Sequence, residues 1–150
     1  MIELDLMGFK EHLKVRTTEG KRHIFDPLRK KWLVLQPEEL VRQLVIQYLL
    51  TEKGYRSSHM AVERMLKVNK LTKRCDILAY DLQQQPLLLV ECKAPQVKID
   101  QGVFHQIAWY NMPLSVKYLM VTNGIATYCC QMDYNKGDYT FLDAIPKYNL

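Results

Sequence analysis

The sequence of 150 residues lacks long apolar runs, and no stretch approaches the roughly 18 consecutive apolar residues of a membrane-spanning helix. Its N-terminus also lacks the charged start, apolar stretch and small-residue cleavage site of a secretory signal peptide. These absences argue against a membrane protein and a secreted protein. We therefore expect a cytoplasmic location and no membrane partner.

The sequence also lacks the cysteine spacings that mark metal sites and disulfide-rich domains. Its four cysteines show neither the paired spacing of a zinc site nor the framework of a small secreted domain: Cys75, Cys92, Cys129 and Cys130. We expect reduced core residues, with a metal site or a disulfide as the alternatives. No GxxxxGK[ST] phosphate loop occurs in the sequence, which excludes an ATP-driven motor in this chain.

What the sequence does have is a globular composition, with 48% apolar and 25% charged residues and enough length for one core. The formal net charge of +5 mildly favours a polyanionic partner. Basic residues are densest in the segment GKRHIFDPLRKKW, residues 20–32. A solvated face and a phosphate-facing surface are both consistent with this density.

Residue periodicity predicts a mixed sheet flanked by helices, in the α/β (α+β) class. Alternation on both sides of Glu19-Gly20 indicates an N-terminal β-hairpin. Pro37 and Gly54 suit the start and end of a helix, and we expect a second helix over residues 99–112 with Val103, Ile107 and Tyr110 on related faces. Further strands are expected over residues 57–68, 74–81, 86–94, 116–124 and 125–134.

Three ionisable residues interrupt the apolar strands. Glu91 and Lys93 are two apart, so they project from one face of a strand, while Cys92 points the other way. If the preceding strand pairs as a hairpin, Asp76 approaches Glu91, and two neighbouring carboxylates favour a divalent cation such as Mg²⁺ or Mn²⁺. The structural alternative is an ordinary Glu91–Lys93 ion pair, with Asp76 capping a turn.

Together, Asp76 and the run Glu91-Cys92-Lys93 resemble the motif of the PD-(D/E)xK nuclease superfamily, with Cys75 in place of the proline. The segments PEELVRQ, KRCDILAYD, PLLLVECKAP, HQIAWYN and LMVTNG resemble the N-terminal nuclease domain of type I restriction enzyme R subunits and its small stand-alone relatives. The resemblance implies a restriction-endonuclease-like core over residues 37–145, after an N-terminal β extension over residues 1–36, in one domain of residues 1–150.

The resemblance also implies roles for particular residues. Asp76 and Glu91 match the metal ligands and Lys93 the catalytic lysine, and the backbone carbonyl of Cys92 is a further candidate ligand. Glu39 matches the helical acidic residue that joins the metal site in such nucleases.

Residues near these positions match as well. Glu38 is a rival to Glu39, and an exposed first-turn carboxylate is the alternative for either residue. Arg42 and Gln43 match the neighbours of Glu39 that support the site.

Gln106 and Tyr110 match a Gln-x-x-x-Tyr pattern that helps related nucleases to engage DNA. Their spacing places them on one helical face. The alternative is a half-buried core tyrosine beside a surface glutamine. His59 and His105 match no motif position and are left without a role.

The resulting hypothesis is a nuclease that uses Mg²⁺ or Mn²⁺ to hydrolyse DNA phosphodiester bonds. The alternative is a nucleic-acid-binding or assembly domain of the same fold that does not cleave. DNA is the expected partner. Motor or specificity subunits and a homodimer are left open as further partners.

Overall fold

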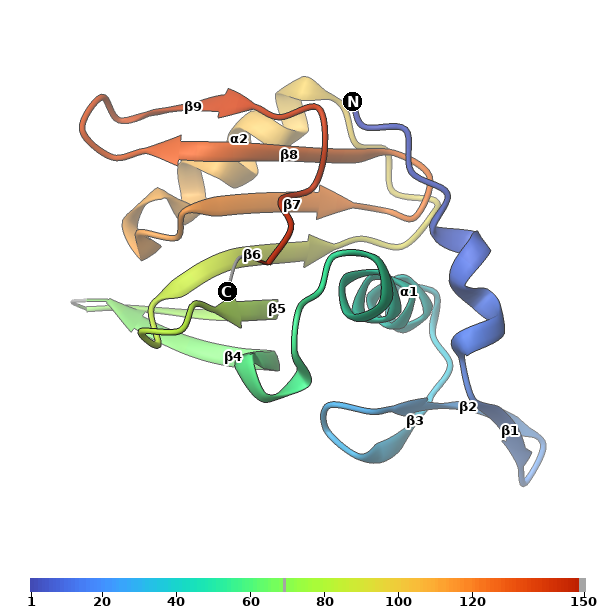
Figure 1. Ribbon diagram of the computed structural model, residues 1–150. Helices are drawn as coiled ribbons and strands as arrows, with labels where there is room; N and C mark the ends of the chain where they lie inside the picture. Colours follow the sequence, from blue (N-terminus) through green and yellow to red (C-terminus); the bar gives the residue numbers. More distant parts are fainter. Residues whose placement is uncertain (69, 149–150) are drawn as a thin grey trace.

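Two separate sheets contain the strands of the computed structural model, which describes residues 1–68 and 70–148 (Figure 1). The small antiparallel sheet has the order β1-β2-β3, with strands at Val15–Thr18, Lys21–Asp26 and Lys31–Val34. The large sheet has the order β4-β5-β6-β7-β8-β9, with strands at Met60–Val68, Leu71–Tyr80, Pro86–Cys92, Tyr118–Thr122, Thr127–Asp133 and Asp138–Phe141. In this sheet β6 and β7 are parallel and the other neighbours are antiparallel, so the predicted mixed α+β class is confirmed.

The N-terminal region is richer than the predicted hairpin. The hairpin forms, and Glu19 and Gly20 at its turn have φ values of 54° and 76°, as a two-residue turn between twisted strands requires. The third strand, β3, and the 3₁₀ helix η1 (Leu6–His12) were not predicted. Both are short, and their burial depends on the rest of the chain, so local periodicity does not reveal them.

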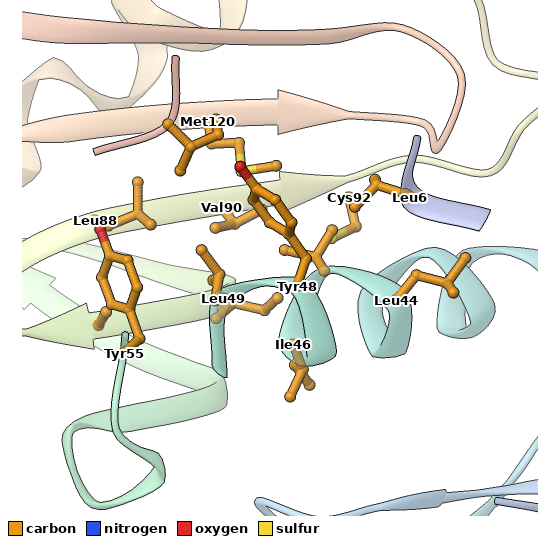
Figure 2. Packing of buried hydrophobic residues seen from close by; sticks show 14 of the residues in the cluster. Leu6, Leu44, Ile46, Tyr48, Leu49, Tyr55, Leu88, Val90, Cys92 and Met120 are labelled. Carbon is orange, nitrogen blue, oxygen red and sulfur yellow. The ribbon is translucent and has the colours of Figure 1, made fainter. Parts of the chain in front are cut away.

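Helix α1 (Pro37–Glu52) covers one face of the large sheet. As predicted, it begins at a proline and is followed by Gly54, which has a φ of 72°. Figure 2 shows Leu44 and Leu49 packed towards β6, whereas Ile46 points away from this sheet. All three side chains are fully or almost fully buried, so α1 is covered on both sides.

Helix α2 (Gln101–Asn111) connects β6 to β7 and lies on the opposite face of the large sheet (Figure 1). The Asp100 side chain caps it by accepting a hydrogen bond from the backbone N–H of Val103. Its buried residues are Phe104, Ala108 and Asn111. Of the residues predicted to lie on related faces, Ile107 packs partly buried against the core, whereas Tyr110 is 61% exposed. The amide of Asn111 donates to the carbonyl of Ile107, which allows this polar residue to be buried on the inner face.

Two short 3₁₀ helices, η2 (Ser57–His59) and η3 (Met112–Leu114), lead into β4 and follow α2. The four cysteines are free and buried, as predicted. Within residues 1–68 and 70–148, no helix has the length and apolar character that crossing a bilayer would require.

A buried carboxylate anchors the turn between β2 and β3. Asp26 is fully buried and accepts hydrogen bonds from the backbone N–H groups of Leu28 and Arg29 at 2.7 and 3.0 Å. It also forms an ion pair with Nε of Arg29 at 2.6 Å. Burial alone would raise the pKa of Asp26, but these hydrogen bonds and the Arg29 charge lower it below its usual value. The turn therefore aims the Arg29 guanidinium inwards.

We expect Asp26→Asn to lower the free energy of unfolding near pH 7 by about 3 kcal/mol, because the variant removes the buried carboxylate that pairs with Nε of Arg29. Since the folded-state pKa of Asp26 is lowered, its stabilising contribution is present above the unfolded-state value of about 4 and is lost as the pH falls through the folded-state value. The difference between variant and wild type should therefore shrink below about pH 4. Urea unfolding of the variant and the wild type, near pH 7 and again below about pH 4, measures the difference. Asp143→Asn, at an exposed aspartate, is the matched control, and an equal effect in both variants would contradict the prediction.

Candidate active site

Strands β5 and β6 separate where the predicted site begins. Their ladder ends with Ile77 opposite Val90, and the next residues along the two strands are Asp76 and Glu91. The backbone N–H of Cys92 donates to the Asp76 carboxylate at 2.8 Å. At this point a side chain replaces a backbone carbonyl as the acceptor of the Cys92 N–H, and this bond holds the Asp76 carboxylate between the two strands.

The backbone also turns at Asp76. On a regular strand Cys75 and Ile77 would share a face. Here Cys75 packs in the cluster beneath α2, and Ile77 packs in the cluster beneath α1. Opposite this point, Glu63 has a φ of 54°, a conformation that a non-glycine residue rarely adopts, and the β4–β5 ladder skips the Glu63–Asp76 pair. Asp76 can therefore contact groups on both faces of the sheet.

On the α1 side, Asp76 is bound by Arg42. The guanidinium donates through Nη2 to Asp76 at 3.1 Å and through Nη1 to Glu39 at 2.7 Å. Burial alone would lower the pKa of Arg42, but the charges of Glu39 and Asp76 raise it above its usual value. The hypothesis that Asp76 caps a turn is therefore wrong.

Glu39 is buried by polar partners. Its carboxylate accepts hydrogen bonds from Arg29, Arg42 and Gln43 at 2.7 to 3.2 Å. Glu38, in contrast, has a half-exposed side chain. The alternative of an exposed first-turn carboxylate thus suits Glu38 and is wrong for Glu39. The structure links Glu39 to Asp76 through Arg42.

The basic segment near the N-terminus contributes one residue to this network. Arg29 contacts Asp26, Glu39 and Glu63, and only 15% of its side chain is exposed. It therefore belongs neither to a solvated face nor to a phosphate-facing surface, which were the two interpretations of the segment. Glu63 also forms an ion pair with Arg74 at 2.7 Å, and these contacts lower its pKa although burial opposes this.

On the other side of Asp76, a pocket of about 320 Å³ opens beneath α2. Its lining residues are Thr72, Lys73, Arg74, Glu91, Lys93, Ile107, Tyr110 and Asn111. Cys92, between Glu91 and Lys93, is buried in the cluster beneath α1, as the alternation predicted. Among the described residues, none of the ion pairs joins Glu91 to Lys93, so that structural alternative is wrong too.

The two carboxylates influence each other. Burial and the negative charge of Asp76 raise the pKa of Glu91 to about 7, against the opposing effect of Lys73 and Lys93. Lys73 is almost fully buried, and burial lowers its pKa. Glu91 therefore lies in surroundings that disfavour its negative charge, although two lysines are near it.

The chemistry of this donor set fits a divalent cation. Across residues 1–68 and 70–148, no three histidine, cysteine or acidic side chains are grouped to hold a metal ion together. Magnesium, however, often takes only one or two carboxylates and keeps several waters. Asp76 and Glu91 supply two, and each Asp76 oxygen accepts one hydrogen bond, which leaves it a second lone pair.

The Gln-x-x-x-Tyr pair lies on the exposed side of α2. Tyr110 is 61% exposed and lines the pocket with Glu91 and Lys93, so the alternative of a half-buried core tyrosine is wrong. Gln106 is exposed and lines a neighbouring hollow that also includes Tyr110. The structure thus places Tyr110 beside the pocket, with Gln106 further along the same helix.

Lys73, Asn111 and Arg29 are among the residues of the site that were not found from the sequence. Lys73 reaches the pocket and lies 3.2 Å from the centre of the Tyr110 ring, yet the strand predicted from the sequence began only at residue 74. Asn111 also lines the pocket, and its buried Oδ1 has no hydrogen-bond partner among the described residues. The signal that could have identified Lys73 was its position three residues before Asp76 on the same strand. The part of Arg29 in the ion-pair network is revealed only by its long-range contacts with Glu39 and Glu63.

Comparison with known proteins identifies a family that covers most of this chain. A family model described as "Type I restriction enzyme R protein N terminus (HSDR_N)" matches residues 37–146. The chain is also similar to a fragment of a putative HsdR subunit of a type I restriction enzyme from Vibrio vulnificus YJ016, with 24% identity and a TM-score of 0.45. That match covers 68% of this chain and 22% of the other. Comparison with curated proteins gave no match.

We expect Asp76→Asn to lower the pKa of Glu91 in the metal-free protein, because the variant removes the neighbouring negative charge. A carbon-detected NMR titration of the glutamate carboxyl groups measures this pKa. Asp81→Asn, in the turn between β5 and β6, makes the same substitution outside the site and should leave the Glu91 titration unchanged. An unaltered Glu91 titration in Asp76→Asn would show that the two carboxylates do not interact.

Proposed function

Because the chain belongs to the type I restriction enzyme R protein N-terminus family, we propose that it is a PD-(D/E)xK nuclease that hydrolyses DNA phosphodiester bonds. The observation that carries the proposal is the meeting of Asp76, Glu91 and Lys93 at the point where β5 and β6 separate. Glu91 and Lys93 line one pocket, and Asp76 is close enough to Glu91 for its charge to raise the pKa of Glu91.

In the proposed site, Asp76 and Glu91 hold Mg²⁺ or Mn²⁺, with the Cys92 carbonyl as a further candidate ligand. When bound, the ion supplies Lewis acidity towards a phosphate oxygen and lowers the pKa of water. The cation also offsets the repulsion that raises the pKa of Glu91. Metal affinity should therefore depend on both carboxylates.

Lys93 acts on the reacting atoms. Its ammonium group lies in the same pocket as Glu91 and orients the attacking water by hydrogen bonding. The water oxygen forms a bond to phosphorus and releases one proton to solvent, the bond from phosphorus to the leaving sugar oxygen breaks, and that oxygen takes up one proton from solvent. As negative charge develops on the phosphoryl oxygens, the positive charge of Lys93 stabilises it.

Arg42 positions Asp76 for this role. It binds one carboxylate oxygen of Asp76 while Glu39 and Gln43 fix the other end of the network. Glu39 as a metal ligand stays a prediction, because its oxygens are engaged by Arg29, Arg42 and Gln43 in the described structure. Its observed contacts support a role in orienting Arg42.

The second candidate function is DNA binding or assembly without cleavage. The observation in its favour is the Arg42–Asp76 ion pair, which offsets part of the negative charge that a cation needs. Motor or specificity subunits and a second copy of the chain remain proposals as partners. In either function, DNA would lie over the opening that contains Lys93.

Cleavage of supercoiled, linear and single-stranded DNA with Mg²⁺ or Mn²⁺ tests the nuclease proposal. We expect cleavage that EDTA abolishes and that Lys93→Ala reduces by at least about a hundredfold, the usual scale for loss of a positioned catalytic group. Lys98→Ala, at an exposed lysine nearby, should retain wild-type activity. Cleavage that survives Lys93→Ala would refute the mechanism, and DNA binding without cleavage under all these conditions would favour the second function.

Metal binding separates the roles of the acidic residues. By calorimetry with Mn²⁺, we expect Asp76→Asn and Glu91→Gln each to weaken binding at least about tenfold, as expected when a charged ligand is lost. Glu39→Gln should change metal affinity less than either and lower the free energy of unfolding instead, since it disrupts a buried ion-pair network. A larger loss of metal affinity in Glu39→Gln than in Asp76→Asn would establish Glu39 as a ligand.

A further inference from the structure

A second surface adjoins the site on the outer side of α2. His105, Gln106, Trp109 and Tyr110 line a hollow of about 450 Å³, called here the aromatic face. Trp109 and Tyr110 are 63% and 61% exposed, although large aromatic side chains are mostly buried in folded proteins. Tyr110 also lines the active-site pocket, so the two hollows share a wall.

The Trp109 ring is supported from within the helix. The His105 ring lies nearly parallel to it, with an interplanar angle of 23° and 6.4 Å between centroids. Nδ1 of His105 is 2.9 Å from the hydroxyl oxygen of Tyr139 on β9, which ties the imidazole to the sheet. An exposed indole with this support can present a ring face at a low cost in conformational entropy.

The charges beside the aromatic face are mainly positive. Lys73, Arg74 and Lys93 line the shared pocket, where Glu91 is the single acidic lining residue. Lys73 places its ammonium group 3.2 Å from the centre of the Tyr110 ring. A basic groove next to exposed aromatic rings is the combination that binds single-stranded nucleic acid, because the cations contact phosphates and the rings stack on bases.

A double helix fits this surface less well, because its bases already stack on one another and offer no free face. We infer that the aromatic face binds single-stranded DNA, with Trp109 stacked on a base and the backbone running towards Lys93. The choice of DNA rests on the proposed function. The stacking itself depends only on the aromatic face.

The other tryptophan provides an internal control. Trp32 lies in the small sheet, and the guanidinium of Arg16 already covers its ring at 4.1 Å from the centroid. Among the described residues, no lysine or arginine covers the Trp109 ring in this way. In Trp32→Phe, Trp109 is the one tryptophan left in the sequence, so its fluorescence reports on the aromatic face alone.

The experiment titrates Trp32→Phe with an oligothymidylate of about twelve nucleotides, within the usual site size, in EDTA so that no metal-dependent cleavage occurs. We expect quenching of Trp109 fluorescence by this strand. An abasic strand of equal length keeps the phosphates and should quench far less, and a blunt duplex should bind more weakly than the single strand. Trp109→Ala should weaken binding roughly tenfold, measured by anisotropy of a labelled strand, and Trp109→Tyr should retain most of the affinity.

Several results would overturn the inference. These are equal quenching by the abasic strand, a preference for the duplex, or unchanged affinity in Trp109→Ala with an unaltered melting temperature. Self-association that Trp109→Ala abolishes, without an effect on strand binding, would assign the surface to a second copy of the chain. Because binding is measured without metal, its failure leaves the cleavage and Lys93 results intact, and the two proposals fail separately.

Discussion

The candidate site depends on the ion pairs that the Arg42 guanidinium forms with Glu39 and Asp76. The guanidinium is almost fully buried, and a buried cation is tolerated only when it is paired and hydrogen-bonded. Glu39 lies on its own helix and Asp76 on the central sheet, so satisfying Arg42 fixes the position of α1 against β5. The same contacts hold Asp76 beside Glu91. Because the buried charge of Arg42 must be paired, it fixes the position of one carboxylate of the candidate metal site.

The sheet provides the second constraint. If β5 and β6 stayed paired beyond Ile77 and Val90, Asp76 and Glu91 would be an ordinary cross-strand pair of the sheet. The separation of the strands at this point gives the Cys92 N–H a side-chain acceptor and lets Asp76 contact Arg42 as well. The left-handed backbone of Glu63 on the next strand accompanies this change. Local irregularity of the sheet and local charge therefore occur together, as is common at functional sites.

Residue patterns predicted the parts of this structure that depend on local order. The alternation of Glu91, Cys92 and Lys93 along β6 follows from strand geometry, and the limits of α1 follow from Pro37 and Gly54. The pairing of Arg29 with Glu63 joins residues 34 positions apart, and nothing in either local sequence encodes it. The buried face of α2 was not predicted, because Asn111 is buried there through a hydrogen bond to the carbonyl of Ile107, and residue polarity alone does not indicate this.

The Arg29 contacts also bear on where the functional unit begins. The family match starts at residue 37, yet the partners of Glu39 and Glu63 include an arginine from the preceding β2–β3 turn. A fragment that began at residue 37 would keep every motif residue. It would lose Arg29, whose positive charge pairs with the carboxylates of Glu39 and Glu63. The family match and the ion-pair network therefore begin at different residues, and the small sheet contributes a residue to the network that supports the candidate site.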